Sequence, residues 1–188
     1  LDTDPLDVAS THSKVSILRH VVSFAEELLL FSDQTQFMMT GGTTLTAKNV
    51  AINVATEFEM DKDVKPIGSG NNVFFAFPKG NFTGFREFFV EDTTDVKKAD
   101  DITANVPKYI PKNIFKMSVA TNENIVVALS SDEQNALYIH QFFSSNQKKL
   151  QSAWHKWIFG ASATETILGM DFIENLLYLV IERSDGVY

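Results

Sequence analysis

The chain contains 188 residues, 44% of them hydrophobic and 21% charged, which is enough for one domain with a substantial core. It lacks cysteine, so disulfides, zinc–thiolate sites and thiol nucleophiles are excluded. A formal net charge of −8 disfavours a broad basic face that grips phosphate backbones, and no apolar run approaches the roughly 20 residues of a membrane helix.

Four short apolar runs, each preceded by a polar turn, recur along the chain at intervals of roughly 50 residues. Runs of about five apolar residues bounded by Asn, Gly, Ser and Asp predict buried strands, because helices need ten or more residues. The four runs occupy residues 28–31, 73–77, 125–129 and 176–181. We predict that each run is the buried central strand of a small sheet.

Strand-like stretches flank these runs and define a repeating unit. One stretch precedes each run, at residues 21–24, 64–67, 115–119 and 167–172. Another follows each of the first three runs, at residues 36–39, 85–90 and 137–143. A fourth strand fits residues 50–58 and 150–159, but its counterpart between residues 102 and 110 is unclear.

The repeat predicts the fold class. A hairpin-based unit that recurs every 40–50 residues or so is typical of a β-propeller blade, because one small twisted sheet cannot bury both of its faces alone. We therefore predict an all-β, antiparallel, β-propeller-like repeat of about four blade-type units. The fourth unit lacks its third strand, so an incomplete or open propeller, or a β-sandwich, fits the same pattern.

The remaining segments set the predicted domain organisation. The polar residues 1–14 are predicted to form an extended arm or linker, and residues 15–188 the propeller-like β domain, as a fragment of a longer chain. Residues 92–113 are polar and contain two prolines, which predicts a long loop or a short helix. Residues 19–31 have the propensity of an amphipathic helix, but their counterparts in the other units are strand-like, so we favour strands.

The histidines do not indicate a metal site. His12, His20, His140 and His155 are scattered, without the spacing that metal ligands favour. His20 and His140 fall in predicted strands, where structural or surface roles are expected.

The motifs that could support catalysis are absent or weak. There is no Gly-x-Ser-x-Gly nucleophile elbow, and the glycine-rich residues 68–71 precede a strand instead of the helix that a phosphate loop needs, which predicts a turn. Ser145 and Lys148 fit Ser-x-x-Lys, a pattern short enough to arise by chance. We predict no catalytic, cofactor-binding or metal-ligating residue, and no enzyme activity.

Two groups of residues, four carboxylates and two tryptophans, could serve either a binding role or a structural role. The carboxylates Glu57, Glu59, Asp61 and Asp63 would share one face of an extended strand, where they could bind a cation or form a solvated edge that resists aggregation, and we favour the edge. Trp154 and Trp157, three positions apart, would face opposite sides of a strand. We expect one tryptophan in the core and the other at a subunit contact, or, less favoured, as a sugar platform.

A series of segments in chain order carries a resemblance. These segments are residues 4–9, 21–24, 28–37, 70–76, 86–87, 100–103, 122–124 and 150–157. Together they span nearly the whole chain and resemble the tail tubular protein B (nozzle) family of short-tailed bacteriophages. Full-length members of that family are several times longer, so the resemblance implies an internal segment.

The resemblance implies a structural role in the virion. Family members assemble as a homohexameric ring at the distal end of the phage tail, below the tail tubular protein A adaptor, and offer surfaces for tail fibres. The bore of the ring conducts genome DNA during ejection without binding it tightly. The implied location is the virion tail, after assembly in the host cytoplasm, with propeller-like β domains and no catalytic residues or small-molecule substrate.

A second hypothesis from another class is a carbohydrate-binding or carbohydrate-active β-propeller. It requires several acidic and aromatic side chains that converge on one pocket. The position of the four carboxylates, in a pocket or on an edge, distinguishes the two hypotheses.

Overall fold

The structure, a computed structural model, describes residues 16–41, 46, 49–91, 94–145, 148–160 and 165–188. All regular secondary structure in these residues is β-strand, and the strands form four antiparallel sheets, none of them closed on itself. The prediction of an all-β fold made of four blade-like units is confirmed. The part of the chain that the structure describes contains no helix that could cross a membrane.

Each sheet takes its strands from one continuous stretch of chain. The first sheet contains β1 (Leu18–Phe24), β2 (Glu27–Ser32), β3 (Gln36–Thr40) and β4 (Ala51–Thr56). The second contains β5 (Ile67–Ser69), β6 (Asn72–Lys79), β7 (Phe82–Glu91) and β8 (Val96–Asp101). The third contains β9 (Ile114–Ala120), β10 (Ile125–Ser130), β11 (Ala136–Ser145) and β12 (Lys148–Ile158). The fourth contains β13 (Thr166–Ile173), β14 (Leu176–Arg183) and β15 (Gly186–Val187).

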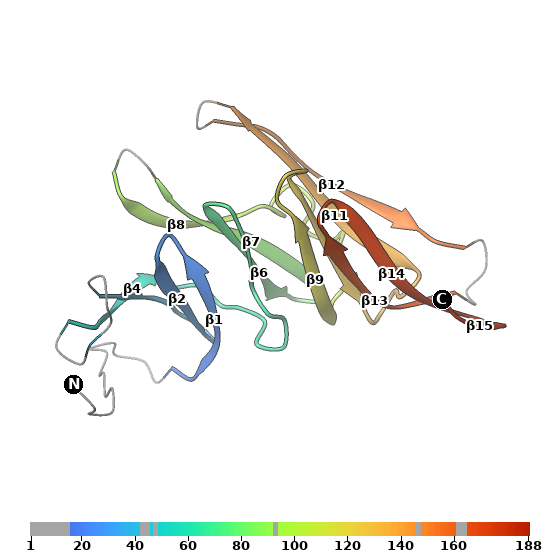
Figure 1. The fold of residues 1–188 in the computed structure, drawn as a ribbon, viewed down its shortest axis with the longest axis horizontal. Helices are drawn as coiled ribbons and strands as arrows, with labels where there is room; N and C mark the ends of the chain where they lie inside the picture. The colour runs from blue at the N-terminus through green and yellow to red at the C-terminus, as the bar shows by residue number, and fades with distance from the viewer. Residues whose placement is uncertain (1–15, 42–45, 47–48, 92–93, 146–147, 161–164) are drawn as a thin grey trace.

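The sheets are meanders in which consecutive strands are neighbours. They follow one another across the molecule in chain order, from the blue first sheet to the red fourth sheet (Figure 1). The four predicted apolar runs form β2, β6, β10 and β14, which are the second strands of their sheets and have a paired strand on each side. Their first strands β1, β5, β9 and β13 each lie at the end of the strand order, and neighbouring first strands contact one another.

Three hydrophobic clusters join the sheets, one between each neighbouring pair. The alternation along β6 shows how this works, because successive side chains of a strand point to opposite faces. Val73 and Phe75 belong to the cluster shared with the first sheet, whereas Phe74 and Ala76 belong to the cluster shared with the third, and all four are fully buried. β10 alternates in the same way between the second and fourth sheets.

The fourth sheet differs because the outward residues of its second strand are exposed. Every second residue of β14 packs against the cluster of the third sheet, namely Leu177, Leu179 and Ile181. The intervening residues are Leu176, Tyr178 and Val180, which are 64%, 52% and 46% exposed. The prediction of a buried central strand is therefore confirmed for β2, β6 and β10 but wrong for β14, whose inward residues are only half-buried.

Two predictions for the second sheet were wrong. The segment 92–113, predicted as a loop or short helix, contains the edge strand β8, where only Ala99 is buried, so the apolar pattern that would reveal a strand is missing. The first strand was predicted at residues 64–67, but β5 begins at Ile67. Val64 is 1% exposed because the loop before β5 inserts it into the core.

The segment 19–31 forms the predicted strands, not a helix. β1 and β2 pair in a hairpin whose turn residues, Ala25 and Glu26, both have positive φ. This left-handed backbone is the geometry of the tight hairpin turns that match strand twist. The predicted arm at residues 1–14 lies outside the described residues.

Candidate functional site

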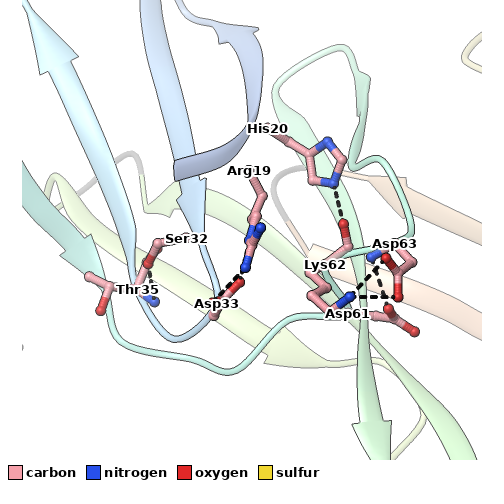
Figure 2. Close-up of polar contacts among 8 residues, drawn as sticks. All are labelled: Arg19, His20, Ser32, Asp33, Thr35, Asp61, Lys62 and Asp63. Carbon is pink, nitrogen blue, oxygen red and sulfur yellow. Dashed lines mark hydrogen bonds and ion pairs between the residues drawn. The ribbon is translucent and has the colours of Figure 1, made fainter. Parts of the chain in front are cut away.

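The four carboxylates do not form a shared site. Glu57, Glu59, Asp61 and Asp63 lie in the loop between β4 and β5, so the predicted extended strand is wrong at these positions. The Asp61 carboxylate accepts a hydrogen bond from the Asp63 backbone N–H at 3.1 Å, and Asp63 pairs with Lys62 at 3.1 Å (Figure 2). In the described part of the chain, no group of three or more acidic or histidine side chains could hold a metal ion.

The loop has a structural reason for leaving the strand conformation. It crosses from the first sheet to the second and buries Met60 on the way, with 4% exposure. The Met60 N–H donates to the carbonyl of Asp33 at 3.1 Å, and the Asp61 N–H donates to the carbonyl of Ala76 at 2.8 Å. The backbone hydrogen bonds of the loop therefore connect the first sheet to the second.

Polar contacts fix the same loop to the first strand. The His20 ring nitrogen Nε2 lies 2.8 Å from the carbonyl oxygen of Lys62 in the loop (Figure 2). Arg19 on the same strand pairs at 2.8 Å with Asp33, the residue of the turn between β2 and β3 whose carbonyl accepts the Met60 N–H (Figure 2). The Arg19 guanidinium, which donates a hydrogen bond to Asp33, holds the pKa of that carboxyl below its ordinary value. These contacts agree with the structural role predicted for His20.

His140 is also structural. It lies on β11, is fully buried, and has its ring 5.0 Å from Trp154 and 5.4 Å from Phe142. Its Nε2 lies 2.9 Å from the Ser152 hydroxyl, while its Nδ1 has no partner among the described residues. Burial, and secondarily the positive charge of Lys149, lowers the pKa of His140 to about 3. The imidazole is therefore neutral throughout the physiological range.

The two tryptophans lie on opposite faces of β12, as predicted. Trp154 packs against the cluster between the second and third sheets, and its indole N–H donates to the carbonyl of Ile102 at 3.0 Å. Trp157 is 46% exposed, beside His155. The predicted subunit contact of the outward tryptophan stays a prediction.

Other sequence motifs have ordinary structural positions. The glycine-rich residues 68–71 form the end of β5 and the turn to β6, with Gly70 at a φ of 57°, as predicted. Ser145 ends β11 and Lys148 begins β12, and the residues between them lie outside the described part of the chain. His12 lies there too.

A hollow of about 510 Å³ lies where the first strands meet. Its lining comes from β1, from β5 and the two residues before it, from β9 and from β13. We call it the first-strand hollow. Sequence reasoning missed it, because residues as far apart as Val21 and Asp171 come together only through the packing of successive sheets.

Asp171 forms the polar centre of one wall of this hollow. Its Oδ1 accepts hydrogen bonds from the Ser118 hydroxyl at 2.6 Å and from the Phe172 N–H at 3.0 Å, and its Oδ2 pairs with Lys116 at 3.1 Å. The Ser118 hydrogen bond is the largest cause that lowers the pKa of Asp171 below its ordinary value. The carboxylate therefore stays ionised and ties β13 to β9.

The junction between the second and third sheets contains an ion pair with one buried partner. Glu87 on β7 pairs with Lys149 on β12, and the Glu87 side chain is 3% exposed. The side-chain amide of Asn72 donates a second hydrogen bond to Glu87 at 2.8 Å. The ion pair joins one sheet to the next, and the Asn72 amide holds the carboxylate from within the second sheet.

Comparison with known proteins now identifies the family. A family model described as bacteriophage nozzle protein matches residues 1–188. The chain is 36% identical over 188 residues to a curated protein named tail tubular protein gp12 from Escherichia phage T7. That match covers 100% of this chain and 23% of the relative, so the chain spans less than a quarter of the relative's length. Because the family model matches every residue, the chain belongs to the bacteriophage nozzle protein family.

Proposed function

We propose that the chain is a structural part of a phage tail nozzle, in the virion, and not an enzyme. The observation that carries this proposal is the match of the nozzle family over residues 1–188, together with the 36% identity to a tail tubular protein. The fold agrees with a structural role, because ion pairs such as those of Glu87 with Lys149 and of Lys116 with Asp171 join one sheet to the next.

In this proposal the polypeptide that contains the chain forms a homohexameric ring, and the bore of the ring conducts genome DNA during ejection. The partners are the tail tubular protein A adaptor and the tail fibres, and assembly takes place in the host cytoplasm. The net charge of −8 supports a conduit that does not hold DNA, since tight binding of a polyanion requires several Lys or Arg contacts.

Negative-stain electron microscopy of a polypeptide of the relative's full length that contains this sequence tests the proposal. The expected result is a population of rings with sixfold symmetry. A monodisperse monomer under conditions where the T7 relative forms particles would contradict the ring. The T7 protein serves as the matched control, because the two sequences align over the whole of this chain.

A further inference from the structure

The lining of the first-strand hollow shows that strand edges face it. Successive residues of a strand point to opposite faces of its sheet, so a hollow above one face is lined by alternate residues. Here the hollow is lined by five consecutive residues of β9, Phe115 to Val119, and by three consecutive residues of β1, Val21 to Ser23. A continuous run of this kind lines a hollow only when the edge of the strand points into it.

Those edges carry backbone groups that can pair with another strand. β1, β5, β9 and β13 each end the strand order of their sheet, so one side of each lacks a paired strand within the sheet. Unpaired N–H and C=O groups along an edge strand are a template for an added extended peptide. A binding site of this construction accepts main-chain hydrogen bonds from a polypeptide.

The charges of the lining favour an acidic ligand. Among the described residues, the lining includes two lysines, Lys65 and Lys116, and one aspartate, Asp171. Lys116 is already paired with that carboxylate, whereas Lys65 has no ion pair among the described residues. The hollow therefore has an excess positive charge on a chain whose formal charge is −8. A carboxylate on the ligand would complement Lys65.

The apolar part of the lining fits side chains next to that carboxylate. The lining residues Val21 on β1 and Phe115 on β9 are 51% and 40% exposed. The volume of about 510 Å³ lies within the range of roughly 300–1,000 Å³ that is usual for ligand pockets. The hollow can thus hold a few residues of extended chain.

From this geometry we propose that the first-strand hollow binds a short extended peptide segment that carries a carboxylate flanked by apolar side chains. The segment pairs with the free edge of β9 or β1, its carboxylate meets Lys65, and its apolar side chains contact Val21 and Phe115. This binding activity is additional to the structural role in the nozzle and does not depend on it.

Nucleic acid fits the hollow less well. Single-strand binding requires a positive groove that follows the backbone and several aromatic side chains on which bases stack. Among the described lining residues, Phe115 is the single aromatic one, and Lys116 is neutralised by Asp171. Unpaired strand edges, by contrast, offer N–H and C=O groups that form hydrogen bonds with a polypeptide backbone.

A titration followed by ¹H–¹⁵N NMR tests the proposal on the 188-residue chain. The probe is acetyl-TVDVT-amide, and its matched control is the same peptide with asparagine in place of the aspartate. We expect saturable shifts at the amides of Ser23, Gly68 and Val119, and weaker binding of the asparagine peptide. Lys65→Gln should weaken binding of the aspartate peptide roughly tenfold, as for the loss of one charge-assisted hydrogen bond. Lys108→Gln, at an exposed lysine outside the hollow, should leave the affinity for the aspartate peptide unchanged.

Three outcomes would overturn the proposal. The first is shifts that avoid the first strands, or no saturable shifts at all. The second is equal affinity for the aspartate and asparagine peptides, together with no effect of Lys65→Gln. The third is that a short oligothymidylate shifts the same amides more strongly, with steep salt dependence, which would assign the hollow to nucleic acid.

Discussion

The ring of Phe77 lies directly over Gly84 on the neighbouring strand, in register with it. A β-carbon built at Gly84 would lie 2.3 Å from the Cζ of Phe77, far inside van der Waals contact. The same ring lies 4.8 Å from the guanidinium of Arg86, which stacks at 3.9 Å on Phe58 from the loop between the first and second sheets. Glycine at position 84 therefore keeps Phe77 in the place where Arg86 can stack on both rings.

We predict that Gly84→Ala destabilises the chain by about 1–3 kcal/mol, the usual cost of overpacking in a core. The added methyl group would displace the Phe77 ring and weaken its contact with Arg86. Urea denaturation followed by circular dichroism measures the change. Gly169→Ala is the control, because a β-carbon there meets nothing within 4 Å. Equal stability of the two variants would contradict the packing described here.

The ion pair between the buried Glu87 and the exposed Lys149 gives a second prediction. Lys149→Gln leaves the buried Glu87 carboxylate with the Asn72 amide as its hydrogen-bond donor among the described residues, so we expect a loss of about 2 kcal/mol. The double variant Glu87→Gln, Lys149→Gln removes the uncompensated charge and should recover a substantial part of that loss. Double-mutant-cycle analysis of the unfolding free energies checks this. Additive losses would show that the two side chains do not interact.

A third prediction concerns pH and His140. The pKa of His140 is about 3 in the folded chain, against an ordinary value of 6.5, so between these values the unfolded chain binds a proton that the folded chain does not. The contribution of the neutral His140 to the free energy of unfolding is therefore fully present above pH 6.5. It falls as the pH drops towards 3, by at most about 1.4 kcal/mol per pH unit for one proton. His140→Gln, which is neutral throughout, should show a shallower decline in this window. Parallel urea titrations at several pH values measure the difference, and identical slopes would contradict the assignment.

The strand pattern was predictable where it depends on local sequence. β2, β6 and β10 are buried on both faces, so each appears as a continuous apolar run. β8 was missed because it is an edge strand with only Ala99 buried. The carboxylate loop was misassigned because its path is set by contacts with Asp33 and Ala76, which are distant in sequence.

The candidate site was less predictable than the fold. The first-strand hollow requires the relative placement of four sheets, which no local periodicity encodes. The ion pair of Lys116 with Asp171 joins residues that are 55 positions apart. The sequence did indicate that catalytic motifs are weak, and it indicated the family through an ordered series of short segments that the family match confirms.

The alternation along β14 gives a fourth prediction. Leu179 packs against the third sheet, whereas the adjacent Tyr178 is 52% exposed. Leu179→Ala should cost about 2 kcal/mol, and Tyr178→Ala should change stability by no more than about 0.5 kcal/mol. Thermal unfolding of the two variants compares the faces directly. A larger loss for Tyr178→Ala would mean that the outward face is the buried one.

A fifth prediction concerns DNA. A conduit should let a polyanion slide, so we expect affinity for duplex DNA weaker than about 10⁻⁴ M at physiological salt. Fluorescence anisotropy with a labelled duplex at two salt concentrations tests this. Micromolar binding that weakens steeply with salt would indicate a basic face that holds DNA, in conflict with the proposed conduit.

The central claim is that this four-sheet unit is part of the tail nozzle. Cryo-electron microscopy of virions from a phage that encodes the chain tests it most directly, because the four meander sheets and their order are recognisable in a density map. The account predicts six copies of the unit arranged around the DNA passage at the distal end of the tail. Virions whose tails contain no density for the unit, with the polypeptide absent from their mass spectra, would contradict it.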